Sequence, residues 1–230
     1  MPTPTASLVW LFDVDGTLLT TERSGQRSMA MALEECHGIR DDLSGIRFSG
    51  RTDPLIVADI LARHALSPDE AALDRLWDSM LAHMRRLMTP PRGGLLAGVP
   101  AMLDAVAAEP RWVSALLTGN RTEMARIKLS SFGAWDRFSF GTFGEEGVDR
   151  NGLACLAVER AAERHGVTPE RCIVVGDTEH DVACARAAGA RAVAVATGAR
   201  TRAELAESAP DLLLEDLRDA APMLEWARGL

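Results

Sequence analysis

The sequence predicts an α/β fold in which a parallel sheet is covered by helices on both faces and a helical segment is inserted near the amino-terminal end. Short, continuous apolar runs end abruptly in polar residues or glycine, as buried parallel strands do. From about Pro100 onward, segments with helical periodicity separate these runs, which is the alternation of a parallel sheet. A long interval near the start contains helical patterns and no convincing strand.

Four apolar runs are the predicted strands, and the segments between the later runs are predicted helices. The first run, LVWLF, is followed directly by acidic residues and a glycine. The predicted strands are Leu8 to Phe12, Val113 to Leu117, Cys172 to Val175 and Ala192 to Val195. The predicted helices beside them are Pro100 to Ala108, Arg121 to Phe132, Leu153 to His165 and Asp181 to Ala188.

The interval from about Thr20 to Pro91 is interpreted as an inserted helical unit. Its helical patterns cover Ser24 to His37, Pro54 to His64 and Pro68 to Met88. Its far boundary holds a cluster suited to a hinge or linker, formed by Pro90, Pro91, Gly93, Gly94 and Gly98. We therefore expect a core domain of residues 1–19 and 93–230 and an inserted helical domain of residues 20–92.

The bulk composition is that of an acidic globular protein. Of 230 residues, 47% are hydrophobic and 25% are charged, so a packed core should form, and the formal net charge is −8. This charge argues against a nucleic-acid or acidic-membrane partner, because a polyanion must be met by a basic surface. No leader pattern opens the chain and no apolar run approaches the roughly 18 residues of a membrane span, so we expect a cytoplasmic protein. A monomer and a homodimer both remain open.

Two aspartates follow the first predicted strand. Asp13 and Asp15 lie in the segment FDVDGT, and because side chains alternate along a strand, both should point to one side at its carboxyl end. Open parallel sheets bind ligands at that edge. Two crowded carboxylates repel each other unless a cation or a shared proton lies between them, so the pair indicates a functional site more than an ordinary Asp-Gly turn.

A second acidic pair follows the third predicted strand. Asp177 and Asp181 are four residues apart, so they share a face if they lie in the first turn of a helix. Acidic residues at a helix start also serve as N-caps. Together with Asp13 and Asp15, however, they form an oxygen-rich set of four carboxylates that suits Mg²⁺. The sequence therefore predicts Mg²⁺ as the cofactor, with all four aspartates as candidate ligands.

The second predicted strand ends in Thr118, Gly119 and Asn120, which supply a hydroxyl, a flexible glycine and an amide. A hydroxyl and free backbone N–H groups at a junction between strand and helix can cradle a phosphate. A simple turn held by the threonine hydroxyl would use the same residues. In sequence order the chain reads Asp-x-Asp, then Thr, then a basic residue, then Gly-Asp-x-x-x-Asp.

This ordered set resembles the four motifs of the haloacid dehalogenase (HAD) superfamily, in its phosphoglycolate phosphatase-like branch, over essentially the whole chain. The resemblance implies a HAD-like core with a Rossmann-like parallel sheet and an inserted helical cap. It implies that Asp13 is the nucleophile that accepts a phosphoryl group, that Asp15 is the general acid and then base, and that Thr118 binds phosphate. Dehalogenases proper lack an aspartate at the position of Asp15, so the sequence favours phosphate chemistry.

The third motif departs from the pattern of the family, which usually has a lysine ahead of the helix that precedes the fourth-motif strand. This chain has Arg150 there, in the segment Asp-Arg-Asn. Lys128 falls within the helix after the second motif, which is too early. We therefore assign phosphate binding and charge neutralisation to Arg150, since arginine can form bidentate bonds to phosphate and carboxylate groups.

The expected activity is Mg²⁺-dependent hydrolysis of a small phosphate monoester through an aspartyl-phosphate intermediate, with phosphoglycolate as one candidate substrate. A sugar phosphomutase would share every core residue and would differ in returning the phosphoryl group to a second hydroxyl. A non-catalytic module would retain the fold and bind a phosphorylated metabolite without turnover. In each case the partner is a small phosphorylated metabolite.

One further residue of the predicted cap is a candidate for substrate selection. The segment from Ser49 to Pro54 interrupts the helical pattern with a glycine, a charge and a candidate N-cap, so it could reach down over the catalytic edge. Arg51 would then meet a substrate carboxylate through its planar guanidinium. A solvated surface arginine would look the same in sequence.

Overall fold

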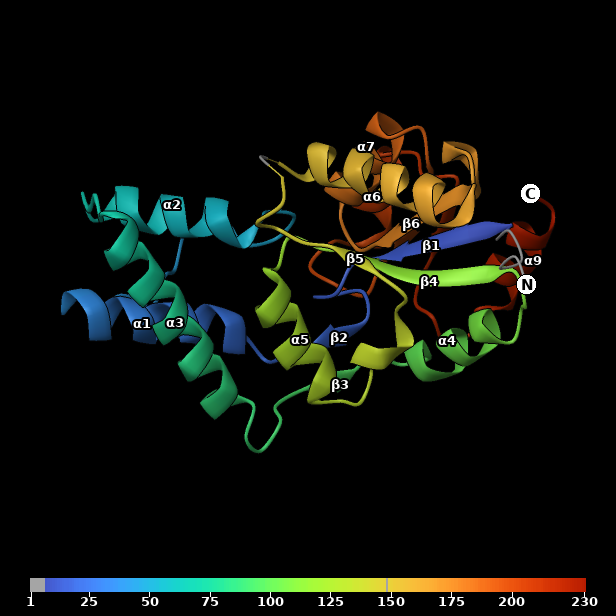
Figure 1. Ribbon diagram of the computed structural model, residues 1–230. Coiled ribbons are helices and arrows are strands. Elements are labelled where there is room, and N and C mark those ends of the chain that lie inside the picture. Colours follow the sequence, from blue (N-terminus) through green and yellow to red (C-terminus); the bar gives the residue numbers. More distant parts are fainter. Residues whose placement is uncertain (1–6, 148) are drawn as a thin grey trace.

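The computed structural model describes residues 7–147 and 149–230, and Val148 and the first six residues of the predicted core domain lie outside it (Figure 1). The strands are β1 (Leu8–Phe12), β2 (Leu19–Thr20), β3 (Gly94–Leu95), β4 (Trp112–Leu117), β5 (Gly141–Thr142), β6 (Cys172–Gly176), β7 (Arg191–Val195) and β8 (Leu212–Leu214). The α-helices are α1 (Ser24–His37), α2 (Asp53–Arg63), α3 (Glu70–Leu87), α4 (Val99–Ala107), α5 (Thr122–Ser130), α6 (Arg150–His165), α7 (Glu179–Ala187), α8 (Arg202–Glu207) and α9 (Ala221–Arg228).

Six strands form one parallel sheet in the order β5-β4-β1-β6-β7-β8. The central strand β1 is buried along its whole length, because helices cover both faces of the sheet. Trp10 and Phe12 point into the core shared with α4, α5 and α9, whereas Val9 and Leu11 point into the core shared with α6, α7 and α8. The predicted α/β fold is confirmed, and each predicted strand is present with its ends shifted by at most one residue.

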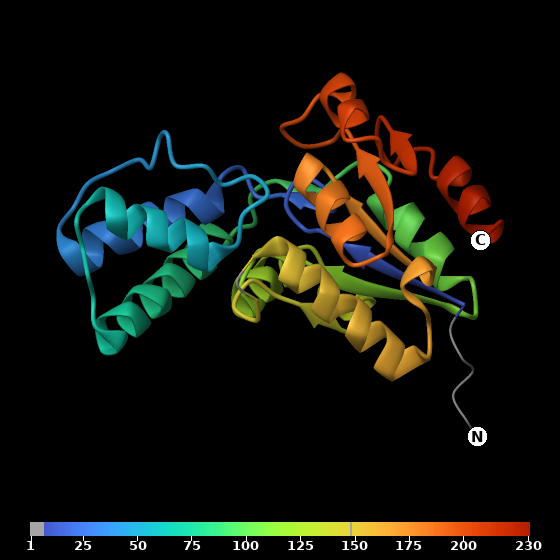
Figure 2. The ribbon, with the colours of Figure 1, turned by 90° about the horizontal axis from the view of Figure 1, so that it is seen from above.

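The helices α1, α2 and α3 form a helical unit that extends to one side of the sheet (Figure 2). They pack around their own apolar cluster, and α1 and α3 lie side by side. Met124 of α5 also belongs to this cluster, so the helical unit rests on a helix of the sheet domain. The chain enters and leaves the unit through an antiparallel ribbon in which Leu19 pairs with Leu95 and Thr20 pairs with Gly94.

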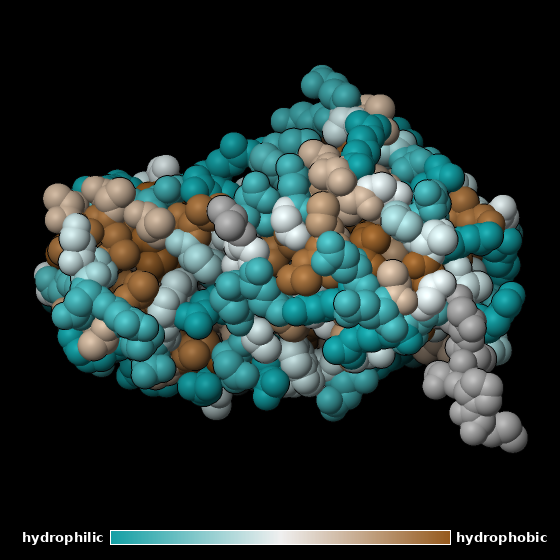
Figure 3. All heavy atoms as spheres, turned by 45° about the horizontal axis from the view of Figure 1, so that its top comes forward, coloured by the Kyte–Doolittle hydropathy of each residue, from teal (hydrophilic) through white to brown (hydrophobic). Residues whose placement is uncertain are grey.

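Hydrophilic side chains cover most of the face in Figure 3, while apolar side chains gather over the helical unit and in the middle of the sheet domain. Among the described residues, Met31 of α1 is the most exposed large apolar side chain, at 37%. No helix in the described part of the chain is long and apolar enough to span a bilayer.

Candidate active site

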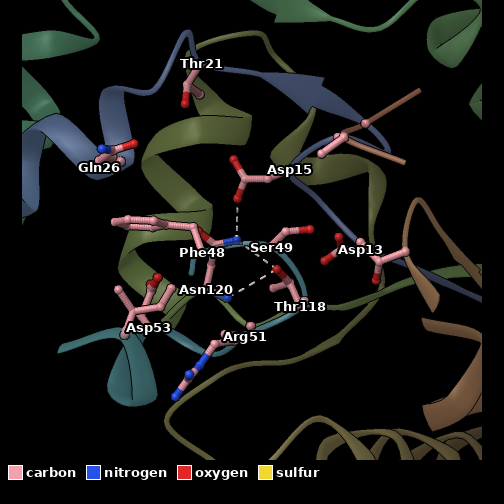
Figure 4. A pocket seen from close by; sticks show the side chains of 18 of the residues that line it. Asp13, Asp15, Thr21, Gln26, Phe48, Ser49, Arg51, Asp53, Thr118 and Asn120 are labelled. Atoms are coloured by element: carbon pink, nitrogen blue, oxygen red, sulfur yellow. Dashed lines mark hydrogen bonds between the residues drawn. The ribbon is translucent and has the colours of Figure 1, made fainter. Parts of the chain in front are cut away.

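The carboxyl ends of β1, β4 and β6 meet at one edge of the sheet, and a polar residue follows each. The last residue of β1 pairs with Leu116 of β4 and Val175 of β6, so the three strands end nearly level. Asp13, Thr118 and Asp177 therefore lie side by side, and all three line a cavity of about 440 Å³ that reaches to the helical unit. Figure 4 shows Asp13 and Thr118 in this cavity.

Three buried aspartates form an acid cluster, which consists of Asp13, Asp177 and Asp181. One carboxylate oxygen from each lies within 4.8 Å of the others. Burial raises the pKa of Asp13 to about 6, although the charge of Arg150 opposes this rise. Burial, together with the charges of Asp13 and Asp181, raises the pKa of Asp177 to about 8. A bound cation would favour the ionised forms of Asp13 and Asp177, and a set of hard oxygen donors suits Mg²⁺.

Asp181 belongs to the acid cluster and also caps the start of helix α7. Its Oδ2 accepts hydrogen bonds from the backbone N–H of Thr178 at 3.0 Å and from the Thr178 hydroxyl at 2.7 Å, which caps α7. Its Oδ1 accepts a hydrogen bond from Arg150. Gly176 must be a glycine, because a Cβ atom there would overlap the Asp181 carboxyl group. The two interpretations of the second acidic pair, cap and metal ligand, are therefore compatible.

Arg150 lies next to the acid cluster, at the start of α6. Its Nη2 is 3.1 Å from Oδ1 of Asp13 and also contacts Asp181, and its side chain is 9% exposed. Its Nε is buried without a hydrogen-bond partner in the described part of the chain. A buried guanidinium with a spare donor is suited to an incoming anion. The structure thus brings together Asp13, Asp177, Asp181 and Arg150, as expected.

The Asp15 carboxylate lies apart from the acid cluster, which differs from the expectation that its side chain shares the metal site. Its Oδ2 accepts a hydrogen bond from Nζ of Lys128 at 2.6 Å. It also accepts one from Nδ2 of Asn120 at 2.7 Å (Figure 4). Asn120 Nδ2 also donates to the Thr118 hydroxyl at 2.8 Å. These bonds hold the Asp15 carboxylate against Asn120 in the loop after β4 and against Lys128 of α5.

The expectation that Lys128 is placed too early in the chain to enter the site is wrong. Helix α5 starts shortly after Asn120 and carries Lys128 back to the cavity, where its Nζ contacts Asp15 and donates to Asn120 Oδ1 at 2.6 Å. Lys128 shares the buried face of α5 with Met124 and Leu129. The signal that could have identified Lys128 is a charged residue on an otherwise apolar helix face. An unpaired buried ammonium group is costly, so such a residue is expected to have an acidic or polar partner.

The helical unit contacts the loop after β4 through the start of α2. The backbone N–H of Asp53 donates to the carbonyl of Gly119 at 2.7 Å, and Oδ2 of Asp53 accepts from the backbone N–H of Arg121 at 2.8 Å. A Cβ atom on Gly119 would overlap the carbonyl oxygen of Arg51. Burial raises the pKa of Asp53 to about 6. Apart from its place at a helix start, nothing in the sequence singles out this residue.

Arg51 does not face the catalytic edge. Its Nη1 lies 2.7 Å from Oδ2 of Asp59, within the same helical unit, and its side chain extends away from Asp13 and Asp15 (Figure 4). This placement differs from the expectation that the guanidinium meets a substrate carboxylate, because the guanidinium already forms an ion pair with Asp59. The backbone of Arg51, and not its side chain, lies against the loop after β4.

Among curated proteins, this chain is similar in sequence to several phosphatases. It is 26% identical to a phosphoglycolate phosphatase from Agrobacterium fabrum over 219 residues, which cover 93% of this chain and 91% of that protein. It is 30% identical to a phosphoglycolate phosphatase from Cereibacter sphaeroides over 183 residues, 79% of this chain and 81% of that protein. Phosphoglycolate phosphatase 1 from Pseudomonas aeruginosa matches locally, at 40% over 62 residues, which are 27% of this chain and 23% of that protein.

Solved structures share the fold. The crystal structure of CbbY from Rhodobacter sphaeroides in complex with phosphate has a TM-score of 0.76 at 21% identity and covers 94% of this chain and 96% of that chain. A hydrolase from Pseudomonas syringae has a TM-score of 0.72 at 20% identity, covering 95% of this chain and 98% of that chain.

Family models match the segments that build the site. A model described as HAD-hydrolase-like matches residues 153–220, which include the second acidic pair. A model described as haloacid dehalogenase-like hydrolase matches residues 10–186, well over half of the chain and the whole range from Asp13 to Asp181. The chain therefore belongs to the haloacid dehalogenase-like hydrolase family.

Proposed function

We propose that this enzyme hydrolyses a small phosphate monoester, with Asp13 as the nucleophile and Mg²⁺ held by the acid cluster. One observation supports the proposal most strongly. Asp13 is buried at the end of β1, its Oδ1 lies 3.1 Å from Nη2 of Arg150, and it still lines the cavity. A carboxylate in that position has the cationic surroundings that an attack on an anionic phosphoryl group requires.

In the first half of the reaction, an oxygen of Asp13 attacks phosphorus and the bond from phosphorus to the leaving oxygen breaks. Asp15 donates a proton to that leaving oxygen. The Thr118 hydroxyl and the backbone N–H groups after β4 bind the phosphoryl oxygens, while Arg150 offsets their charge. When bound, Mg²⁺ would reduce the repulsion between the nucleophile and the phosphoryl group.

In the second half, water replaces Asp13 on phosphorus. The ionised Asp15 takes a proton from a water molecule, whose oxygen attacks the aspartyl phosphate and breaks its bond to Asp13. Inorganic phosphate leaves, and Asp15 is protonated again for the next cycle. Asp15 is suited to both proton transfers because its carboxylate faces the cavity and is held in place by Asn120 and Lys128.

The helical unit, residues 20–92, would act as the cap over this reaction, with residues 1–19 and 93–230 as the core domain. Phe48 and Met29 contribute apolar side chains to the cavity, and Gln26 contributes an amide. Such a lining would exclude bulk water and contact the leaving group. The ribbon of β2 and β3 is the proposed hinge, because both chain crossings run through it.

Small phosphorylated acids are the proposed substrates, with phosphoglycolate as the first candidate. The curated relatives that align with most of this chain include phosphoglycolate phosphatases. A cavity of about 440 Å³ is suited to a small metabolite.

A phosphatase screen tests the proposal directly. The purified protein is assayed against small phosphorylated acids, sugar phosphates and aryl phosphates, with Mg²⁺ and with EDTA, and Asp13→Asn serves as the inactive control. We expect phosphate release that requires Mg²⁺ and Asp13. Isomerised sugar phosphate without phosphate release would instead indicate a mutase, and metabolite binding without turnover would indicate a non-catalytic module.

A further inference from the structure

Lys128 contributes a buried ammonium group to the side of the cavity that faces away from the acid cluster. The residue is 5% exposed, and its Nζ donates to Oδ2 of Asp15 and to Oδ1 of Asn120, each at 2.6 Å. An ammonium group has three N–H donors. Within the described residues two of them are used, which leaves one donor for a ligand in the cavity that Lys128 lines.

This ammonium group lies next to the place that the leaving group would occupy in the proposed reaction. Lys128 contacts the same carboxylate that gives its proton to the leaving oxygen. On its other side, a Cβ atom on Gly25, at the start of α1, would be 3.6 Å from Nζ. The ammonium group therefore lies between Asp15 and the helical unit, beside the atoms that the leaving oxygen carries with it.

The other cations of the cavity are engaged elsewhere or exposed. Arg150 contacts Asp13 and Asp181 in the acid cluster, and Arg51 is paired with Asp59. Arg23 lines the cavity but is exposed to solvent, so its charge is screened by water. Among the described lining residues, Lys128 is thus the buried cation on the leaving-group side.

We infer that Lys128 is the specificity-determining residue of this enzyme, and that its remaining N–H binds an anionic group of the substrate close to the ester oxygen. A carboxylate one carbon from that oxygen is the simplest match. The charge-assisted bond would form on an ammonium group that is itself almost wholly buried, where such bonds are strong. The preferred substrates are then phosphate esters of small hydroxy acids, not of neutral alcohols. The inference rests on the proposed function, because that function defines the leaving-group side.

A binding experiment separates this inference from turnover. In an Asp13→Asn background with Mg²⁺, calorimetry compares phosphoglycolate with 2-hydroxyethyl phosphate, which replaces the carboxylate by a neutral hydroxymethyl group of similar size. We expect phosphoglycolate to bind at least about tenfold more tightly, the scale of one charge-assisted bond. Adding Lys128→Met should reduce this ratio to near one, Lys128→Arg should restore part of it, and Arg51→Ala should leave it unchanged.

Several outcomes would overturn the inference. An unchanged ratio in Lys128→Met would remove Lys128 from specificity, and an equal loss of affinity for both ligands would reduce its role to holding Asp15. Loss of the ratio in Arg51→Ala would transfer the role to Arg51. The Asp15 side chain is 44% exposed, so water can solvate it after Lys128→Met and the fold should survive. Lys128→Gln is a second variant, which keeps a polar side chain but removes the charge. It should also reduce the ratio of the two affinities to near one.

The experiment also distinguishes the failure of the inference from the failure of the proposed function. If the native chain releases no phosphate from any substrate but the affinity ratio depends on Lys128, the phosphatase assignment fails and the anion site stands. If the native chain hydrolyses both esters with equal kcat/KM and the ratio is near one throughout, the phosphatase assignment stands and the anion site fails.

Discussion

At the scale of single residues, the cavity separates its charges into two groups. Asp13, Asp177 and Asp181 lie together, with Arg150 in contact with Asp13 and Asp181, whereas Asp15 is paired with Lys128. The first group surrounds the site where a phosphoryl group would be transferred, and the second lies where the leaving group would be protonated. This separation gives phosphoryl transfer and leaving-group protonation each a cation of its own, and it leads to two predictions.

Arg150→Ala should lower kcat/KM by roughly two to four powers of ten, because one group that offsets transition-state charge is lost. Arg150→Lys keeps the charge but not the planar fork, so it should recover part of the activity. Steady-state kinetics on one neutral ester, 2-hydroxyethyl phosphate, measure both variants beside Lys128→Ala. Lys128→Ala should cost less on this substrate, and a larger loss than in Arg150→Ala would contradict the assignment.

Asp177→Asn should weaken the affinity for Mg²⁺ by roughly one to two powers of ten, because one of three charged oxygen ligands is removed. The Mg²⁺ concentration that gives half of the maximal activity should rise by the same factor. The measurement is a Mg²⁺ titration of activity at saturating substrate. Glu179→Gln is the matched control, since this neighbouring acid pairs with Arg200 outside the acid cluster. If Glu179→Gln shifted the titration as far as Asp177→Asn, the proposed ligand set would be wrong.

The candidate site could be predicted where local sequence determines position, and not where tertiary packing does. Asp13 and Asp177 follow buried strands, so their place at the sheet edge follows from strand geometry. The position of Lys128 depends on how α5 packs between the sheet and the helical unit. The pairing of Arg51 depends on Asp59, which lies on α2, eight residues further along the chain. Spacing in the sequence does not determine either contact.

At the scale of elements, the loop after β4 connects the proposed chemistry to the helical unit. Its glycine, Gly119, accepts a hydrogen bond from Asp53 and lies against the carbonyl of Arg51. The same loop supplies Thr118 and Asn120 to the cavity. A change in this loop should therefore alter cap contact and phosphate binding together.

Gly119→Ala should lower kcat/KM by at least about tenfold while the sheet domain stays folded, because a methyl group would displace the start of α2 from the loop, and small misplacements at a catalytic site are costly. Gly152→Ala is the control, since its would-be Cβ atom meets only Oδ1 of Asp149, at an ordinary 3.5 Å, and its φ is not positive. Kinetics and circular dichroism on both variants provide the test. Equal activity in the two variants would show that the contact has no role in the reaction.

The elements that the sequence predicted are those with enough residues to show a period. The helices α1, α2 and α3 and the central strands are long or wholly apolar, so their patterns are unambiguous. The strands β5 and β8 have two and three residues, and β8 is only half-buried. The ribbon of β2 and β3 has two residues per strand, with one exposed position. Such short segments have no period, and only the neighbouring strand makes them extended.

At the scale of the whole molecule, the contact between the helical unit and the sheet domain buries an acid. Asp53 is 6% exposed where the two parts meet, and burial raises its pKa to about 6 from an ordinary value of 3.8. The folded protein therefore holds this proton more tightly than the unfolded chain. It follows that Asp53 destabilises the folded state increasingly as pH rises from about 4 to about 6, and by a constant amount above that range.

Asp53→Asn should therefore stabilise the protein near neutral pH and have little effect near pH 4. The difference between the two proteins in the free energy of unfolding should grow by roughly 2–3 kcal/mol over this interval, as a shift of about two pKa units implies. Urea unfolding at several pH values in EDTA measures it, with the exposed Glu207→Gln as the control. A difference that is independent of pH would mean that Asp53 titrates normally.

The central claim is that Asp13 forms a covalent bond to phosphorus, and chemical trapping of that bond tests it most directly. The enzyme is mixed with Mg²⁺ and its best substrate from the screen, quenched, and treated with borohydride, which reduces an acyl phosphate to an alcohol and so converts the modified aspartate to homoserine. We predict that mass spectrometry of the peptides finds homoserine at position 13, and none in Asp13→Asn. Homoserine at any other aspartate, or full turnover by Asp13→Asn, would contradict the account.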